Sequence, residues 1–205
     1  MLSSGGGIFS FQPASHSDFD PNRDLVFIPY EQYNKPITEF DCDDSDLNNF
    51  ILRKDEVGYF EKENLGKTML VLCQKEENLP KVISYYTLSS SKISIEEKHY
   101  LHKGCKLKEF PTIKIGRLAV IKEFKRKGIG HYCLDKILLT IEPLSKTIGI
   151  RFIDVDAYNK PEIIKFYEDY GFVVSPLHKS NRHTVPMYLD LMRVKEAMYP
   201  ASTRP

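Results

Sequence analysis

Residues 113–139 read IKIGRLAVIKEFKRKGIGHYCLDKILL, and this stretch decides the fold. Residues 113–121 are apolar and rich in β-branched side chains, which predicts a mostly buried strand. Residues 122–130 are basic and carry two glycines, and from Ile129 onward apolar residues recur at helical spacing. The stretch therefore predicts a strand, a basic turn and a helix in direct succession.

The basic turn between this strand and this helix suits the binding of a phosphate. The first turn of a helix leaves backbone N–H groups without partners and carries the positive end of the helix dipole. Gly128 and Gly130 lack a Cβ, so an anion can approach the backbone closely. Positive charge is supplied by Lys122, Lys125, Arg126 and Lys127. A basic turn is also often plain solvated surface, and the turn alone leaves both interpretations open.

Two common phosphate motifs do not match the turn. A Walker loop needs a glycine, four residues and then Gly-Lys-Ser/Thr, a pattern absent from the chain. The dinucleotide fingerprint needs a third glycine three residues after the second, where Cys133 stands. What remains at residues 125–130 is a basic residue, two spacers, a glycine, one spacer and a second glycine.

Composition gives no bias toward nucleic acid or membrane. The chain has 205 residues, enough for one domain with a full core, and its net charge is +1, from 29 Lys and Arg against 28 Asp and Glu. Its four cysteines lie far apart and form no C-x-x-C pair, which favours a reduced, intracellular protein. The sequence shows no signal peptide and no apolar run of about 20 residues, so we expect a cytoplasmic protein without membrane spans.

The other segments predict an alternation of strands and helices in one domain, residues 25–192, between an N-terminal extension (residues 1–24) and a C-terminal tail (residues 193–205). Further strands are predicted at residues 25–30, 67–74, 81–88, 149–155, 172–174 and 184–191. A helix capped by Ser45 or Asp44 is predicted to contain Leu47, Phe50 and Ile51, and a second helix is predicted through Phe60. A further helix is predicted over residues 161–170, where Pro161 suits N1 and Gly171 suits C′. Residues 84–87 are expected to be a half-buried central strand, and Pro143 is expected to bend or end its helix. Strand, helix, strand around residues 113–155 implies parallel pairing.

The polar segment from Ser89 to Pro111 raises the question of a metal site. A short helix is expected at residues 96–102, and on it His99, His102 and Cys105 would share one face. No fourth ligand stands at a familiar spacing, so the sequence predicts no metal.

Two groups of residues together resemble the GNAT N-acetyltransferases. Residues 117–120 (RLAV) and 125–130 (KRKGIG) are similar to the acetyl-CoA signature, in which the family usually has Arg or Gln where Lys125 stands. Asn159 after a strand, followed by FYEDYGF at residues 166–172, is similar to the later GNAT motif. The resemblance covers roughly residues 25–191, and FDCDDSDLNNFILR also resembles toxin-type GNATs of bacterial toxin–antitoxin modules.

The resemblance implies an α/β GNAT fold, whose mixed, mostly antiparallel sheet has splayed parallel central strands and flanking helices. It implies acetyl-CoA as co-substrate, without a metal. The pantetheine arm would pair with the backbone of Leu118, Ala119 and Val120 and be bonded by Asn159. The pyrophosphate would lie on the turn formed by Lys125, Arg126, Lys127, Gly128, Ile129 and Gly130.

The resemblance also implies transfer of an acetyl group to a primary amine, with Tyr167 as general acid. A phenol with a pKa near 10 is protonated at pH 7 and can donate to the departing thiolate. No Cys or Ser stands in a nucleophile motif, and Cys133 lies on an apolar helix face, so we expect direct attack in a ternary complex. No base is evident: Glu109, Glu123 and His99 are candidates by type only, and a water chain serves equally well.

The acceptor stays open in the sequence. Arg117 either faces the acceptor cleft or pairs with a carboxylate. The amine could belong to a small molecule, a protein or the aminoacyl end of a charged tRNA, for which Lys103, Lys106, Lys108 and the cluster at 122–127 would contact phosphates. A non-catalytic module of the same fold that binds CoA or RNA is the alternative, and a homodimer and an antitoxin partner stay open.

Overall fold

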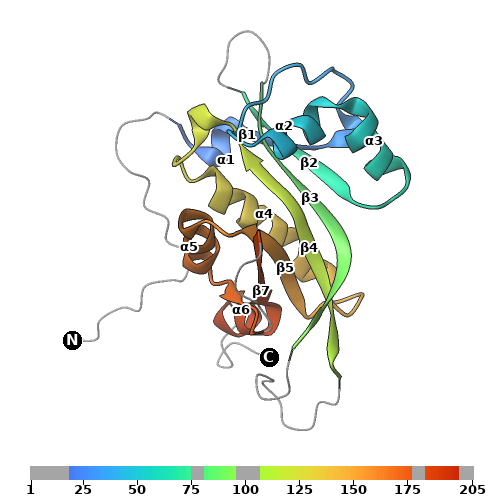
Figure 1. The fold of residues 1–205 in the computed structure, drawn as a ribbon, viewed down its shortest axis with the longest axis vertical. Coiled ribbons are helices and arrows are strands. Elements are labelled where there is room, and N and C mark those ends of the chain that lie inside the picture. The colour runs from blue at the N-terminus through green and yellow to red at the C-terminus, as the bar shows by residue number, and fades with distance from the viewer. Residues whose placement is uncertain (1–18, 75–80, 96–106, 177–182, 199–205) are drawn as a thin grey trace, which may run out of the picture.

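The computed structural model describes residues 19–74, 81–95, 107–176 and 183–198 (Figure 1). Within them, a mixed sheet has the strand order β1-β2-β3-β4-β5-β7-β6. The strands are β1 (Leu25–Pro29), β2 (Lys67–Cys73), β3 (Lys81–Ser94), β4 (Glu109–Val120), β5 (Phe152–Tyr158), β6 (Val173–Val174) and β7 (Thr184–Asp190). The helices are α1 (Pro21–Asp24), α2 (Ser45–Leu52), α3 (Lys54–Lys62), α4 (Ile129–Leu144), α5 (Pro161–Tyr170) and α6 (Leu191–Met198). Short 3-10 turns cover Tyr30–Gln32 and Lys122–Phe124.

The sheet is antiparallel except at its centre. β4 and β5 pair in parallel, and α4 connects them, as the succession of strand, helix and strand predicts. The hairpins β2–β3 and β6–β7 are antiparallel, also as predicted. The expected mixed, mostly antiparallel α/β sheet with a parallel central pair is therefore confirmed.

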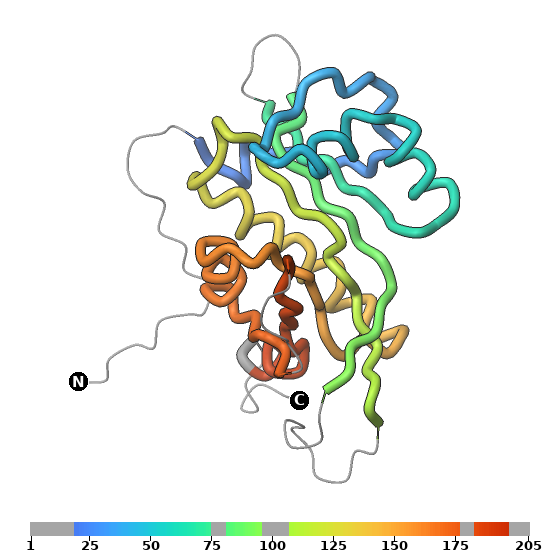
Figure 2. Tube along the Cα trace, in the orientation of Figure 1, coloured from blue at the N-terminus to red at the C-terminus, as the bar shows by residue number. Residues whose placement is uncertain are grey.

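Helices cover both faces of the sheet. Adjacent residues of a strand point to opposite faces, so neighbouring residues of β3 contact different helices. On β3, the Ser84 Oγ lies 3.5 Å from the Cys133 Sγ of α4, whereas the Tyr85 hydroxyl donates to the Leu47 carbonyl of α2 at 2.7 Å. α5 packs beside α4, where the rings of His131 and Phe166 stack at 4.7 Å. Figure 2 shows α2 and α3 gathered near one end of the long strands β3 and β4.

Helix coverage corrects the expectation that residues 84–87 form a half-buried strand. Ser84, Tyr85, Tyr86 and Thr87 are all buried. Three of their four hydroxyls have partners: the Ser84 Oγ donates to the Ala119 carbonyl at 2.7 Å, the Tyr85 hydroxyl donates to Leu47, and the Thr87 and Thr68 hydroxyls lie 3.2 Å apart. Ser84, Tyr85 and Thr87 are therefore core residues with satisfied hydrogen bonds.

Several boundaries differ from the sequence expectation. β3 and β4 are longer than predicted because they stay paired as far as Ser94 and Glu109. β5 begins at Phe152 instead of Gly149, and α6 occupies the start of the expected tail. In the expected N-terminal extension, α1 contacts the domain, where Asn22 accepts from the Tyr132 hydroxyl at 2.9 Å.

Other expectations are confirmed, and some lie outside the described residues. α5 starts with Pro161 and ends at Gly171, whose φ of 107° is left-handed. α4 ends one residue after Pro143. The helix expected at residues 96–102, with His99, His102 and Cys105, lies outside the described residues. No helix among the described residues has the length and apolar character to cross a membrane.

The contact between α4 and α5 depends on Gly130. A Cβ at this position would lie 2.9 Å from Cε2 and 3.0 Å from Cζ of Phe166. The Phe166 ring cannot easily move away, because it is held between His131 and Tyr167. We predict that Gly130→Ala lowers the free energy of unfolding by about 1–3 kcal/mol, measured by urea denaturation.

Gly58 of α3 provides the matched control, because a Cβ there would meet no atom within 4 Å. Gly58→Ala should raise the free energy of unfolding by about 0.5–1 kcal/mol through helix propensity. Phe166→Leu should reduce the cost of Gly130→Ala in a double-mutant cycle. If the two alanine variants gain stability alike, the steric account of Gly130 is wrong.

Candidate functional site

The central feature of the site is a gap between β4 and β5. The two strands pair only over residues 112–115 and 152–155. Beyond this point β4 continues to Val120 bonded to β3 alone, and β5 continues to Tyr158 bonded to β7 alone. The strands therefore splay apart inside the sheet, as expected. Each presents an edge of backbone N–H and C=O groups that an extended ligand with amides can pair with.

A bulge in β4 marks the start of this gap. Thr87 of β3 pairs with Arg117 and Leu88 pairs with Ile115, so Gly116 is the extra residue of β4. A bulge bends its strand and increases the local twist, and glycine is frequent at such positions. Because the bulge follows the last parallel pair, it accounts for the direction in which β4 leaves β5.

The turn after β4 brings together all six residues predicted to hold a pyrophosphate. The turn is shaped by Arg126 and Gly128, which have left-handed φ angles of 62° and 80°. Gly128 is the N-cap of α4, and no side chain caps this helix. The N–H groups of the first turn are therefore available to an anion. Ile129 is buried, so it anchors the turn in the core and offers a ligand only its backbone.

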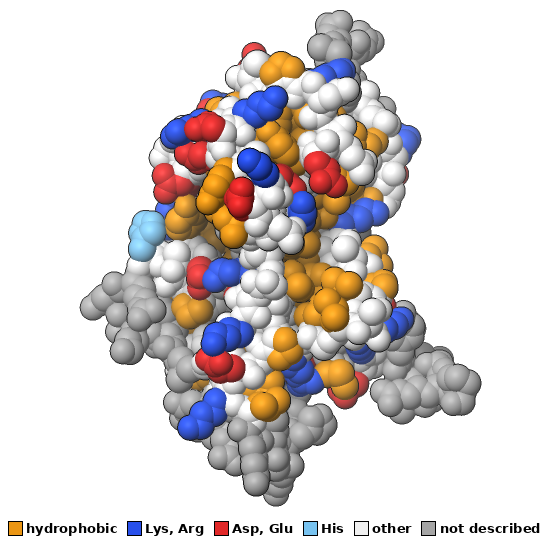
Figure 3. All heavy atoms as spheres, turned by 90° about the vertical axis from the view of Figure 1, so that its right-hand side faces the viewer, with side chains coloured by type: hydrophobic (Ala, Val, Ile, Leu, Met, Phe, Trp, Pro, Cys, Tyr) orange, Lys and Arg blue, Asp and Glu red, His pale blue; other side chains and the backbone are white. Residues whose placement is uncertain are grey.

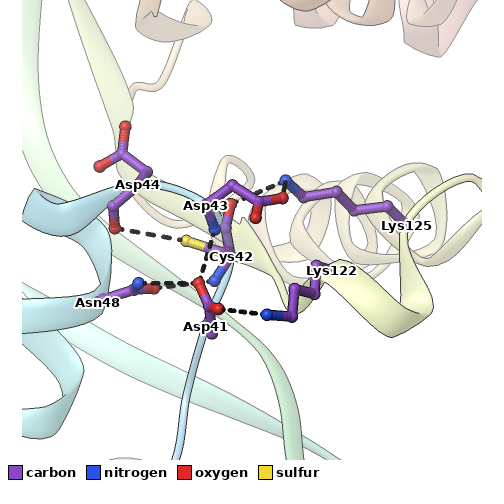
Figure 4. A network of polar contacts seen from close by, with 7 residues as sticks. All are labelled: Asp41, Cys42, Asp43, Asp44, Asn48, Lys122 and Lys125. Carbon is purple, nitrogen blue, oxygen red and sulfur yellow. Dashed lines mark hydrogen bonds and ion pairs between the residues drawn. The ribbon is translucent and has the colours of Figure 1, made fainter.

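The lysine side chains of the turn do not point to an open anion site. The Lys125 ammonium lies 2.7 Å from the Asp43 carboxylate and 2.8 Å from the Cys42 carbonyl. Lys122 is paired with Asp41 at 2.7 Å, and Figure 4 shows both lysines reaching the loop before α2. The Lys127 ammonium lies 4.6 Å from the centre of the Phe124 ring. Arg126 is exposed and pairs with no described carboxylate, so the turn offers a phosphate its backbone and this one guanidinium.

This network connects α2 with the turn before α4. The hydrogen bond from Lys122, with further bonds from the Asp43 N–H and the Asn48 amide, lowers the pKa of Asp41 to about 2. The same bond raises the pKa of Lys122. Asp44 follows in the loop and caps α2, since its carboxylate accepts from the Leu47 N–H at 3.0 Å. The pairs are exposed, so salt screens them.

Tyr167, the residue predicted to act as general acid, is buried on α5. The residue is 6% exposed, and its ring packs on Phe166 and Phe172 with centroids 4.9 and 5.3 Å away. Burial raises the pKa of its hydroxyl above the ordinary value. Among the described residues, this hydroxyl has no hydrogen-bond partner. Tyr170 is different, because its hydroxyl donates to Asp135 at 2.8 Å. A buried phenol without a partner is costly unless a ligand completes its bonding.

The remaining predicted cofactor residues line the two edges of the gap. Leu118, Ala119 and Val120 form the end of β4, and the Ala119 carbonyl is already occupied by Ser84. Asn159 is exposed immediately after β5, and its N–H donates to the His183 carbonyl at 2.9 Å.

Two chemical alternatives can be compared with the structure. Cys133 is 0% exposed, and burial raises the pKa of its thiol to about 12, which excludes it as a nucleophile.

Among the candidate bases, Glu109 is paired with Lys92 at 2.9 Å, Glu123 is exposed, and His99 is outside the described residues. Within the described part of the chain, no group of three His, Cys, Asp or Glu side chains is arranged to hold a metal ion.

Arg117 occupies a position that the sequence left undecided. Its guanidinium carbon lies 3.7 Å from the ring centre of Phe50 in α2 and 5.0 Å from that of Phe60 in α3. No described carboxylate pairs with it. The residue therefore faces the side of the sheet covered by α2 and α3. The sequence could not indicate this contact, because Phe50 and Phe60 also fit ordinary core positions.

Comparison with known proteins identifies the fold. No family model matches the chain. Among solved structures, AtaT carrying a tyrosine-to-phenylalanine change, bound to the C-terminus of the antitoxin AtaR and acetyl-CoA, is 20% identical with a TM-score of 0.67; the match covers 85% of this chain and 98% of that one. A tyrosine-to-phenylalanine mutant of KacT is 20% identical with a TM-score of 0.71 (85% and 99% covered). AtaT complexed with acetyl-methionyl-tRNAfMet is 19% identical with a TM-score of 0.69 (85% and 99% covered). The chain therefore has the expected GNAT fold, which it shares with these toxin structures.

Proposed function

We propose that the protein is an N-acetyltransferase that moves the acetyl group of acetyl-CoA to a primary amine by direct attack. One observation carries the proposal: the unpaired edge of β4 leads within a few residues to the uncapped N-terminus of α4. An amide-containing arm and a pyrophosphate, joined as they are in CoA, would suit these two features in this order. The complex of AtaT with acetyl-CoA supports the same assignment.

The residues on the two sides of the gap have distinct roles in this proposal. The backbone of Leu118, Ala119 and Val120 would pair with the pantetheine amides, and Asn159 would bond them from the β5 side. The N–H groups of residues 128–130 would hold the pyrophosphate, with Lys125, Arg126 and Lys127 nearby. Lys125 would contribute little charge to a phosphate while Asp43 holds it.

Tyr167 would act when the thioester breaks. The amine forms a bond to the acetyl carbon, the carbon–sulfur bond breaks, and the sulfur receives a proton or a hydrogen bond from the Tyr167 hydroxyl. Its raised pKa keeps the phenol protonated, and no described residue bonds its hydroxyl, so the proton is available to a ligand. A module that only binds CoA or RNA has no need of such a buried acid.

The aminoacyl end of a charged tRNA is the second candidate acceptor, favoured by the complex of AtaT with acetyl-methionyl-tRNAfMet. Figure 3 shows one face on which basic and acidic side chains are interspersed, so this face carries no extended positive field for phosphates. Lys108 is exposed, and Lys103 and Lys106 lie outside the described residues. Assays with free amines and with charged tRNA separate the two acceptors.

The cofactor assignment predicts a specific loss of binding in Gly128→Glu. This change places a side chain and a negative charge at the N-cap of α4. Loss of two charge-assisted hydrogen bonds would weaken acetyl-CoA binding by about 100-fold or more in calorimetric titration. Gly149→Glu is the control, because a Cβ at Gly149 meets no atom within 4 Å and its binding should equal that of the wild type. A folded wild-type protein that binds neither acetyl-CoA nor CoA would remove the proposal.

The role of Tyr167 predicts a division between turnover and binding. Tyr167→Phe should lower the rate of CoA release in the presence of an amine by about 100-fold or more, because the proton donor is lost. Acetyl-CoA binding should stay within about twofold, since the ring and its packing remain. Equal losses of turnover and binding would show that Tyr167 is structural.

Because no base is evident, the rate of acetyl transfer should depend on pH mainly through the acceptor amine. Burial raises the pKa of Tyr167 above its usual value near 10, so this acid stays protonated and causes no loss of rate up to about pH 10. With an α-amine acceptor, whose pKa is about 7.7–8.0, the rate should rise by no more than about fourfold from about pH 7.5 and be flat from about pH 9 to 9.5. A steep rise over this range would indicate that an acceptor or base must lose a proton at high pH.

A further inference from the structure

The half-buried arginine of β4 has a binding capacity that no described residue uses. Two arginines in the described part of the chain are half-buried, Arg117 and Arg151. Arg151 is paired with the Asp190 carboxylate at 2.8 Å. The Arg117 guanidinium lies against the aromatic rings of Phe50 and Phe60 and near the Tyr85 hydroxyl, and among the described residues no acceptor bonds its N–H groups. A carboxylate accepts from the N–H groups of a guanidinium, as Asp190 does from Arg151. An aromatic ring contacts only the flat face of a guanidinium and leaves its N–H edge without an acceptor, as at Arg117.

The two rings also fix the orientation of the guanidinium. Phe50 is 1% exposed and packs on Tyr85, so it is an immobile support. A planar guanidinium held in this way loses little entropy when its N–H edge forms two parallel bonds to an oxyanion. Carboxylate and phosphate groups share this bidentate geometry. The chemistry of the site is therefore that of an anion receptor.

The position of Arg117 relates this receptor to the reacting atoms. Arg117 is the first residue of β4 after the bulge at Gly116. If the pyrophosphate lies at residues 128–130, the pantetheine arm extends back along residues 118–120, and its thioester end reaches the neighbourhood of Arg117. The side chain of Arg117 contacts α2 and α3, whereas Tyr167 belongs to α5, which packs beside α4. The acid that protonates the leaving sulfur and the anion receptor thus approach from different faces of the sheet.

We propose that Arg117 binds an anionic group of the acceptor, so the preferred acceptor is an amine that carries a carboxylate or a phosphate close to its amino group. This inference rests on the proposed acetyl transfer and specifies the acceptor class of the same site. Arg117 is a recognition residue in this account, and it takes no part in bond making. A free amino acid supplies the carboxylate, and an aminoacyl or aminoalkyl phosphate supplies the phosphate.

The first experiment measures anion binding without turnover. The side-chain Nε–H signal of Arg117 in the full chain is assigned by NMR from its loss in Arg117→Lys. The protein, saturated with CoA, is titrated with O-phosphoethanolamine, with β-alanine and with neutral ethanolamine. The signal should shift with the phosphate or the carboxylate compound and stay in place with ethanolamine. Whichever anion shifts it identifies the chemical source, and a signal that neither anion moves overturns the inference.

The second experiment measures acetyl transfer to β-alanine and its neutral amide, and to O-phosphoethanolamine and ethanolamine. Arg117→Gln should raise KM for the preferred anionic acceptor by about 10- to 100-fold and leave kcat/KM of its neutral counterpart nearly unchanged. Arg151→Gln is the matched control, which removes a similarly buried arginine and should not alter the preference for the anion. Equal losses on charged and neutral acceptors in Arg117→Gln would show that the contact with Phe50 and Phe60 is only structural.

The two experiments also separate this inference from the proposed function. If no amine is acetylated but the Arg117 signal shifts with an anion, acetyl transfer is refuted and the anion receptor stands. If amines are acetylated without any preference for an anionic group, the transfer stands and the inference is refuted.

Discussion

The arrangement of the site follows from one constraint: β4 and β5 stop pairing after residues 115 and 155. Backbone N–H and C=O groups inside a protein need partners, and an unsatisfied group costs about 1–3 kcal/mol. Between the other adjacent strands inside the described sheet, the neighbouring strand supplies these partners. At the gap, only water or a ligand can supply them. The amide edges of the gap therefore suit a ligand that is itself an extended chain of amides, as the proposed function requires.

The elements around the gap keep it open. β4 stays bonded to β3 through Val120, and β5 stays bonded to β7 through Tyr158, so each strand is rigid on its outer side. The bulge at Gly116 sets the direction of β4, and α4 starts directly behind the turn. The ion pairs Lys122–Asp41 and Lys125–Asp43 hold the start of α2 against this turn. These ion pairs therefore join the loop before α2 to the turn before α4, although about 80 residues separate the two segments in the chain.

The sequence predicts most of the fold because its signals are local. The run at residues 113–139 predicts β4, the turn and α4, and Pro161 and Gly171 predict the ends of α5. The contacts of the site could not be predicted from the sequence in the same way, because they join segments that lie far apart in the chain. Gly130 was expected to lack a side chain for the sake of an anion, whereas the space that its Cβ would occupy is taken by Phe166 of α5, a contact that no local pattern indicates. Lys125 was expected to serve a phosphate, but its ammonium is bonded to Asp43 and Cys42. The contact of Arg117 with Phe50 and Phe60 joins three elements, and no local pattern indicates it.

Hydrogen–deuterium exchange of the backbone amides, with and without saturating acetyl-CoA, tests most directly whether the gap holds the cofactor. The account predicts slower exchange at residues 128–130 and at those amides of residues 118–120 that face the gap instead of β3, because the ligand supplies their missing partners. Exchange at residues 112–115 should stay unchanged, because these residues are already paired with β5. Protection confined to other parts of the chain, or no protection when calorimetry shows binding, would contradict the assignment of the gap as the acetyl-CoA site.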